Sequence, residues 1–113
     1  HSALMAPAAA RLEEFLKGVS FRDPVVPVLS NVTGAPHGKA GTIAGAMVRQ
    51  VTSTVQWVTG IGHLKMAGVD RYVECGPGRV LSGLIKRLAP EARLHNVQDA
   101  ASLKKACVEI GGV

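Results

Sequence analysis

Apolar residues along this chain recur at two periods, and the alternation of the two predicts the order of its elements. Apolar positions three or four apart, the spacing of one helix face, run through residues 3–17, 43–51, 55–66, 80–88 and 103–110. Short apolar runs typical of strands cover residues 25–29, 71–75 and 94–97. Strands that alternate with helices predict an α/β fold, a parallel sheet with helices on both faces.

Prolines and short polar side chains mark the ends of several elements. Pro7 lies in the first turn of the first helix, where its missing N–H does least harm. Pro27 indicates that residues 25–29 form an edge strand or a strand end. Thr52-Ser53-Thr54 interrupts the second helical pattern and offers N-caps for the third helix, and Asp99 offers one for the last.

Composition narrows the class of protein. A length of 113 residues allows one domain or less, and 47% apolar content argues against disorder. No apolar run approaches the length that spans a bilayer, and the first residues lack a signal-peptide pattern. Cys75 and Cys107 have no metal-ligand spacing and fit a reducing compartment, so we expect a cytoplasmic protein. The net charge of +5 comes from scattered basic residues, without the motifs or aromatic platforms of nucleic-acid binding.

Chemistry in an open α/β sheet lies at the carboxyl ends of strands, where helix N-termini offer N–H groups. Glu74-Cys75-Gly76-Pro77-Gly78 is such a junction, although a plain strand-to-helix turn is the simpler interpretation. It is not a phosphate loop, because no Lys-Ser or Lys-Thr follows the glycines. Cys75 has no histidine near it in the sequence, so we expect a buried structural residue.

The histidines are His1, His37, His63 and His95, and none is paired at a metal-ligand spacing. A metal site is therefore not expected. His37 falls in a polar loop, and His63 and His95 fall within predicted elements, where structural roles are the more common. On spacing alone, the terminal His1 is only a weak candidate for catalysis.

An ordered series of short segments covers nearly the whole chain. In order they are His1-Ser2-Ala3-Leu4-Met5, Val26-Pro27-Val28, Ser30-Asn31-Val32-Thr33-Gly34, Val48-Arg49-Gln50-Val51, Glu74-Cys75-Gly76-Pro77-Gly78-Arg79-Val80-Leu81 and Asn96-Val97-Gln98-Asp99. Each is weak alone, but the set resembles the malonyl-CoA:acyl carrier protein transacylases from their catalytic-histidine segment onward. We therefore expect residues 1–113 to form the C-terminal part of the large, α/β-hydrolase-like subdomain of an acyltransferase, with no complete second domain.

The resemblance implies a ping-pong transfer of malonyl from coenzyme A to acyl carrier protein in fatty acid synthesis. In this family a serine attacks the thioester and a histidine removes the serine's proton, because a hydroxyl is a poor nucleophile without a base. His1 stands at the position of that histidine. Gln50 stands where the family's backbone carbonyl holds the other ring nitrogen, a neutral acceptor in place of a triad carboxylate. Coenzyme A enters as the thioester substrate, and no cofactor is implied.

The chain lacks other parts that the family requires. It contains no Gly-x-Ser-x-Gly, and the family's malonate-binding arginine and oxyanion-hole donors precede the histidine. We therefore predict that the chain is inactive alone, and that its apolar surface is covered by the missing N-terminal half or by self-association.

Basic residues near the fourth helix are candidates for carrier-protein docking. Acyl carrier proteins are acidic, and complementary charge favours encounter. Arg79, Lys86 and Arg87 lie at the two ends of the helix that follows Gly-Pro-Gly. The alternative is an ordinary solvated helix face, with cations favoured near the helix C-terminus by its dipole.

Two other interpretations of the chain remain open. The acyltransferase domains of polyketide synthases share the histidine and the Asn-Val-Thr-Gly-like segment, although the chain ends soon after its last helix, which favours a freestanding enzyme. A non-catalytic α/β binding or assembly module would also lack a nucleophile.

Overall fold

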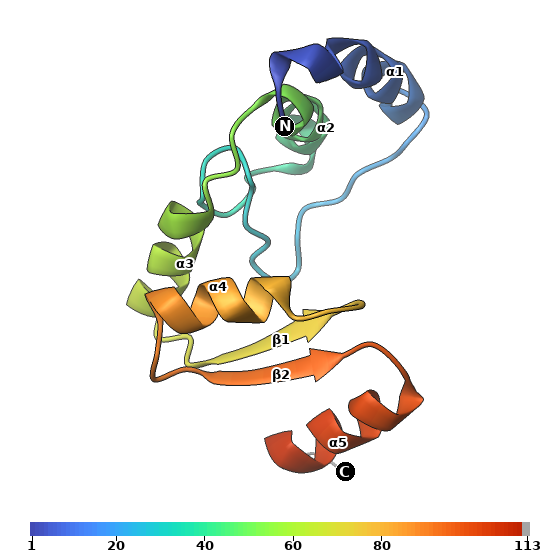
Figure 1. Ribbon diagram of the computed structural model, residues 1–113. Coiled ribbons are helices and arrows are strands. Elements are labelled where there is room, and N and C mark those ends of the chain that lie inside the picture. Colours follow the sequence, from blue (N-terminus) through green and yellow to red (C-terminus); the bar gives the residue numbers. More distant parts are fainter. Residues whose placement is uncertain (112–113) are drawn as a thin grey trace. The chain divides into compact units, whose positions relative to one another are not determined.

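The computed structural model describes residues 1–111, and these form two compact units (Figure 1). The first unit comprises residues 1–63, and the second begins at residue 64. The predicted α/β class is confirmed, because a parallel sheet lies among helices in the second unit.

The first unit is helical. Its elements are the 3-10 turn Ala3–Met5, α1 (Ala6–Leu16), α2 (Ala40–Thr52) and the first part of α3 (Trp57–Met66). The predicted first helix is confirmed, with Pro7 in the first turn of α1, as its missing N–H favours. Helices α1 and α2 pack against each other, and Leu16 and Ala46 are buried between the elements of this unit.

The strand predicted at residues 25–29 is wrong. The segment forms no strand, and its one ladder contact is an isolated antiparallel bridge between Leu29 and Pro36. Val25 is fully exposed, so the apolar run does not enter a core. Pro27 has no N–H, and the chain turns back at once, where the Ser30 N–H donates to the Ala35 carbonyl at 2.8 Å. The proline interrupts the row of donors, and the reversal that follows it leaves no room for a longer ladder.

The turn at residues 30–35 is held against the start of α3. The Gln56 N–H donates to the Asn31 carbonyl at 2.8 Å. Gly34 has a φ of +69°, and a Cβ there would lie 2.8 Å from the Thr59 Cβ. Only glycine therefore suits this position, both for its backbone conformation and for the close approach.

The third helix begins later than predicted. Residues Thr52-Ser53-Thr54 do not cap α3, because that helix starts at Trp57. Thr52 is instead the last residue of α2, and Ser53 is its C-cap in an extended conformation, with φ −107° and ψ 153°. The hydroxyl residues therefore end one helix rather than begin the next.

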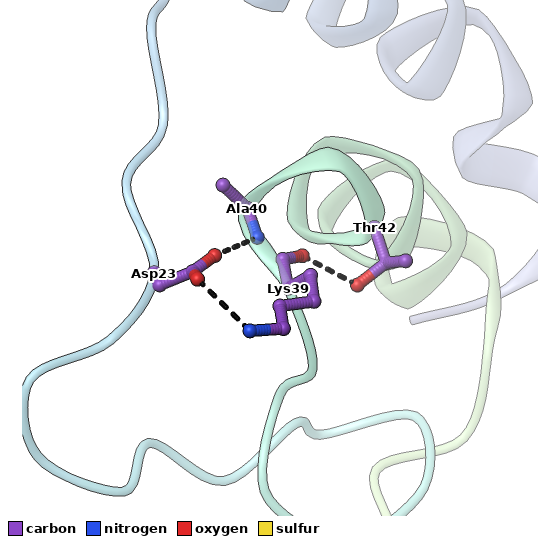
Figure 2. A network of polar contacts seen from close by, with 4 residues as sticks. All are labelled: Asp23, Lys39, Ala40 and Thr42. Carbon is purple, nitrogen blue, oxygen red and sulfur yellow. Dashed lines mark hydrogen bonds and ion pairs between the residues drawn. The ribbon is translucent and has the colours of Figure 1, made fainter.

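The N-terminus of α2 is capped from a distant part of the chain (Figure 2). The N-cap residue, Lys39, provides no side-chain cap of its own. Asp23 takes that place: one carboxylate oxygen accepts from the Ala40 N–H at 2.7 Å, and the other lies 3.4 Å from Lys39 Nζ. A carboxylate at this end of a helix satisfies an orphan N–H and complements the helix dipole. The extended segment before residue 30 is thereby attached to α2.

The second unit is a two-stranded parallel sheet with a helix on each face (Figure 1). Its elements are β1 (Arg71–Cys75), α4 (Val80–Leu88), β2 (Arg93–Val97) and α5 (Ala100–Ile110). The register runs from Arg71 opposite Arg93 to Cys75 opposite Val97. Helix α5 begins at the predicted cap, since the Asp99 side chain accepts from the Ser102 N–H and the Ser102 hydroxyl oxygen accepts from the Asp99 N–H. The predicted strands and helices of this part of the chain are confirmed.

A carboxylate joins both strands to the start of α4. Glu74 accepts hydrogen bonds from the N–H and hydroxyl of Ser82, at 2.8 and 2.7 Å, from the Leu81 N–H at 3.1 Å, and from the Asn96 amide at 3.1 Å. The pKa of Glu74 is lowered, first by the hydroxyl of Ser82 and then by its backbone N–H. This cluster fixes the turn through Gly76-Pro77-Gly78, which connects β1 to α4.

We predict that Glu74→Gln destabilises the chain at pH 7 and makes little difference in acid. Because the pKa of Glu74 is lowered on folding, the ionised form contributes stability that is fully present above its ordinary value of 4.5. That contribution is lost as the pH falls through the lowered pKa. Urea unfolding at pH 7 and pH 3 measures it, with Glu91→Gln, an exposed carboxylate after α4, as the control. Equal losses for Glu74→Gln at both pH values would contradict the prediction.

Candidate functional site

The structure brings His1 and Gln50 together. The Nδ1 atom of His1 contacts the backbone carbonyl of Gln50, which lies in the last turn of α2. A carbonyl only accepts, so this contact requires the proton on Nδ1 and leaves Nε2 unprotonated in the neutral ring. The His1 side chain is exposed, and its Nε2 is therefore available to take a proton from a reacting group.

The acceptor lies at the negative end of a helix dipole. The last four carbonyls of a helix have no partner within it, and together they carry about half a negative charge. The Gln50 carbonyl is one of these, in a helix of 13 residues. It therefore favours the imidazolium that forms when His1 takes a proton. A helix end can in this way do part of what a carboxylate does beside a catalytic histidine.

The side chain of Gln50 has its own partner. Its amide oxygen accepts from the Asn31 side chain at 3.4 Å. Asn31 belongs to the turn at residues 30–35, and its carbonyl is bonded to the start of α3 through Gln56. The turn therefore contacts both helices on either side of the Ser53 break.

The chemistry that this contact allows is proton exchange at the His1 ring. His1 can accept and return a proton, and the chain has no serine in a Gly-x-Ser-x-Gly turn. Within residues 1–111, no three His, Cys, Asp or Glu side chains gather closely enough to hold a metal ion. None of the helices in that range has the length and hydropathy that a bilayer crossing requires.

A cavity of about 460 Å³ in the first unit is separate from this contact. It is lined by Asp23–Pro27 and by Pro36–Lys39, and neither His1 nor Gln50 lines it. The valines along it are largely exposed. Its lining therefore gives no reason to connect this cavity with the contact between His1 and Gln50.

The predicted docking residues lie along α4. Arg79 is its N-cap residue, and Lys86 and Arg87 are exposed in its last turn. Arg79 and Lys86, two helical turns apart, line one cavity of about 280 Å³ together with Asn96 and Ser82. Arg87 does not line that cavity. The structure thus brings two of the three cations to one depression and leaves the third on another side of the helix.

Of two side chains in the sheet, His95 lies where the sequence predicts and Cys75 does not. His95 is buried in β2, and its Nδ1 lies 2.9 Å from a Glu109 carboxylate oxygen, which agrees with a structural role. Cys75 is exposed at the end of β1, so the expectation of a buried cysteine is wrong. The thiol lies on the face of β1 that α5 leaves open, since α5 packs against β2.

Comparison with known proteins gives the same family for sequence and structure. No protein-family model matches the chain. It is 41% identical over 106 residues to the malonyl CoA-acyl carrier protein transacylase of Escherichia coli K12, which covers 94% of this chain and 34% of that protein. It is 37% identical to the Salmonella typhimurium transacylase and 36% identical to that of Bacillus subtilis, over 109 and 106 residues.

Solved structures of such enzymes superpose closely on the chain. The crystal structure of MCAT from Streptococcus pneumoniae matches with a TM-score of 0.88 at 37% identity, over 96% of this chain and 35% of that one. A complex of a type II polyketide acyl-carrier protein with its malonyl-transacylase, PlMCAT with AntF, matches with a TM-score of 0.86 at 39% identity. The chain spans about a third of the length of these relatives. It belongs to the malonyl CoA-acyl carrier protein transacylase family and corresponds to a C-terminal portion of its members.

Proposed function

We propose that this chain supplies the general base of an acyltransferase that moves malonyl from coenzyme A to acyl carrier protein in fatty acid synthesis. The single observation that carries the proposal is the contact between His1 Nδ1 and the Gln50 carbonyl. It leaves Nε2 as the free, basic nitrogen of an exposed ring. In this proposal, the serine nucleophile belongs to the part of the enzyme that precedes the segment matched by this chain.

The proton follows a simple route in the proposed mechanism. The serine hydroxyl gives its proton to Nε2 of His1 as its oxygen attacks the malonyl thioester carbon. The tetrahedral intermediate expels the coenzyme A thiolate, which takes the proton back from Nε2. In the second half, the phosphopantetheine thiol of the carrier protein gives its proton to Nε2 and attacks the malonyl ester, and the serine oxygen recovers the proton. The Gln50 carbonyl stabilises the imidazolium during both halves.

The isolated chain is inactive in this proposal, and its partner is the missing N-terminal portion or a second copy of itself. Support comes from uncovered apolar surface in the second unit. Val80 is 74% exposed, and Val73 is also open to solvent. Within the described residues the sheet has only two strands, so the edge of β1 away from β2 carries unpaired backbone groups. Such a surface favours association.

A second candidate is the acyltransferase part of a polyketide pathway. The polyketide biosynthesis protein ThaF of Burkholderia thailandensis is 35% identical over 91 residues, which are 80% of this chain and 8% of that protein. The proposed proton transfer at His1 is the same for both candidates. A non-catalytic module is the remaining alternative, and the next experiment separates it from both.

We predict that a chimaera in which this chain replaces the matching third of the Escherichia coli transacylase transfers malonyl to acyl carrier protein. His1→Ala in the chimaera should lower kcat by about 10²- to 10⁴-fold, the range of general acid–base catalysis. His37→Ala, which removes a histidine from a loop, is the control. The chain alone, incubated with malonyl-CoA, should show no added malonyl by mass spectrometry. Full activity of the His1→Ala chimaera, or a malonyl adduct on the chain alone, would contradict the proposal.

We also propose that the acidic carrier protein docks beside α4. The supporting observations are that Lys86 and Arg87 are exposed in its last turn, and that Arg79 and Lys86 line one cavity. The exposed Leu81 and Leu84 on the same helix offer apolar area next to these charges. Such charge-rimmed apolar patches suit a partner that is acidic and presents a helix face.

In the active chimaera, Lys86→Glu and Arg87→Glu should each raise KM for acyl carrier protein by about three- to tenfold, through slower encounter with an acidic partner. KM for malonyl-CoA should stay unchanged. Lys104→Glu, an exposed lysine of α5, is the matched charge reversal. Steady-state kinetics with each substrate varied separately gives both constants. An equal rise for the two substrates, or an equal effect of Lys104→Glu, would exclude docking at α4.

A further inference from the structure

We propose that Ser53 is a positioning residue for the general base, because it ends α2 in a way that leaves the Gln50 carbonyl free for His1. This inference rests on the proposed function and adds a residue to it. Among the described residues, no hydrogen bond joins Ser53 to His1. Ser53 acts through the two carbonyls at the end of α2, those of Arg49 and Gln50.

The Gln50 carbonyl is available only because α2 stops. In a continuing helix, each carbonyl accepts from the N–H four residues later, so Gln50 would be bonded to Thr54. At Ser53 the backbone becomes extended, with ψ at 153°, and the chain leaves the helix. The Gln50 carbonyl then keeps only a long hydrogen bond of 3.4 Å from the Ser53 N–H. Its remaining lone pair is the one that His1 Nδ1 contacts.

The Ser53 side chain makes this ending stable. Its hydroxyl donates to the Arg49 carbonyl at 2.6 Å, the acceptor that the Ser53 N–H would serve in a continuing helix. The hydroxyl of Thr52 also reaches that carbonyl, but at 3.5 Å. Ser53 therefore substitutes its side chain for its own backbone N–H, as serine does near helix ends. The N–H shifts to Gln50, and the helix need not extend to satisfy Arg49.

Alanine at this position would favour the opposite outcome. It has no hydroxyl for the Arg49 carbonyl, and it is the best helix former. In Ser53→Ala, the backbone N–H of residue 53 would donate to the Arg49 carbonyl, as in a continuing helix. The Thr54 N–H would then compete with His1 for the Gln50 carbonyl. Threonine keeps the hydroxyl, and its branched Cβ suits the extended backbone found here. Comparison of Ser53→Ala with Ser53→Thr should therefore distinguish the effect of the hydroxyl from that of side-chain volume.

The first test uses nitrogen NMR of the imidazole of His1 in this 113-residue chain. The wild type should carry the neutral ring's proton mainly on Nδ1. Ser53→Ala should move a substantial share of it to Nε2, while Ser53→Thr should retain the wild-type pattern. Thr54→Ala removes a neighbouring exposed hydroxyl and should change nothing. Identical tautomer ratios in the wild type and Ser53→Ala would overturn the inference.

The second test uses the chimaera described above. Ser53→Ala should lower kcat about tenfold for malonyl transfer with KM unchanged, as expected when a base is misplaced by a small distance. Ser53→Thr should restore most of kcat. If His1→Ala lowers kcat as predicted while Ser53→Ala and Thr54→Ala behave alike, the positioning role fails and the proposed function stands. If His1→Ala is fully active, the proposed function itself fails.

Discussion

The hydrogen bond between the His1 ring and the Gln50 carbonyl depends on a general property of helices: their last carbonyls have no partner within the helix. In most helices water or a glycine cap satisfies them. Here one of them faces the imidazole, and its neighbour at Arg49 is satisfied by a serine hydroxyl. A neutral acceptor with the helix dipole behind it can thus hold a base in one tautomer without burying a carboxylate.

Side-chain carboxylates organise both helix N-termini that matter for this architecture. Asp23 caps α2 from a segment that is far away in the sequence, and Glu74 caps α4 from the preceding strand. Each satisfies orphan N–H groups and opposes the positive end of the dipole. The Asp23 cap thereby fixes the start of α2, the helix that carries the Gln50 carbonyl at its other end. The Glu74 cap fixes the turn that precedes α4 and its cations.

The sequence predicted the second unit well because its signals are local. The apolar stripe of α4, the Gly-Pro-Gly turn and the Asp99 cap each lie within one element or its ends. The first unit was harder. An apolar run at residues 25–29 has the composition of a strand, but no partner strand exists for it among the described residues. Pairing is a property of the whole sheet and cannot be derived from one segment.

The candidate site shows the same difference between local signals, which the sequence carries, and non-local ones, which it does not. Only the family resemblance pointed to His1 and Gln50, since a terminal histidine and a backbone carbonyl leave no pattern of their own. Ser53 did have a local signal, but Thr52-Ser53-Thr54 fits the end of one helix as well as the start of another. The backbone angles at Ser53 decide between these two interpretations. Asp23 carried no sequence signal, because its partner at Ala40 lies in another element.

The most direct test of the account weakens the Gln50 carbonyl itself. Replacing Val51 by its α-hydroxy acid turns that carbonyl into an ester, a poorer acceptor, without changing any side chain. The same replacement at Val48 alters the carbonyl of Met47 and serves as the control. Nitrogen NMR of His1 should show the ring proton leaving Nδ1 in the Val51 ester and staying there in the Val48 ester. Equal tautomer ratios in the two esters would contradict the claim that Gln50 holds the base.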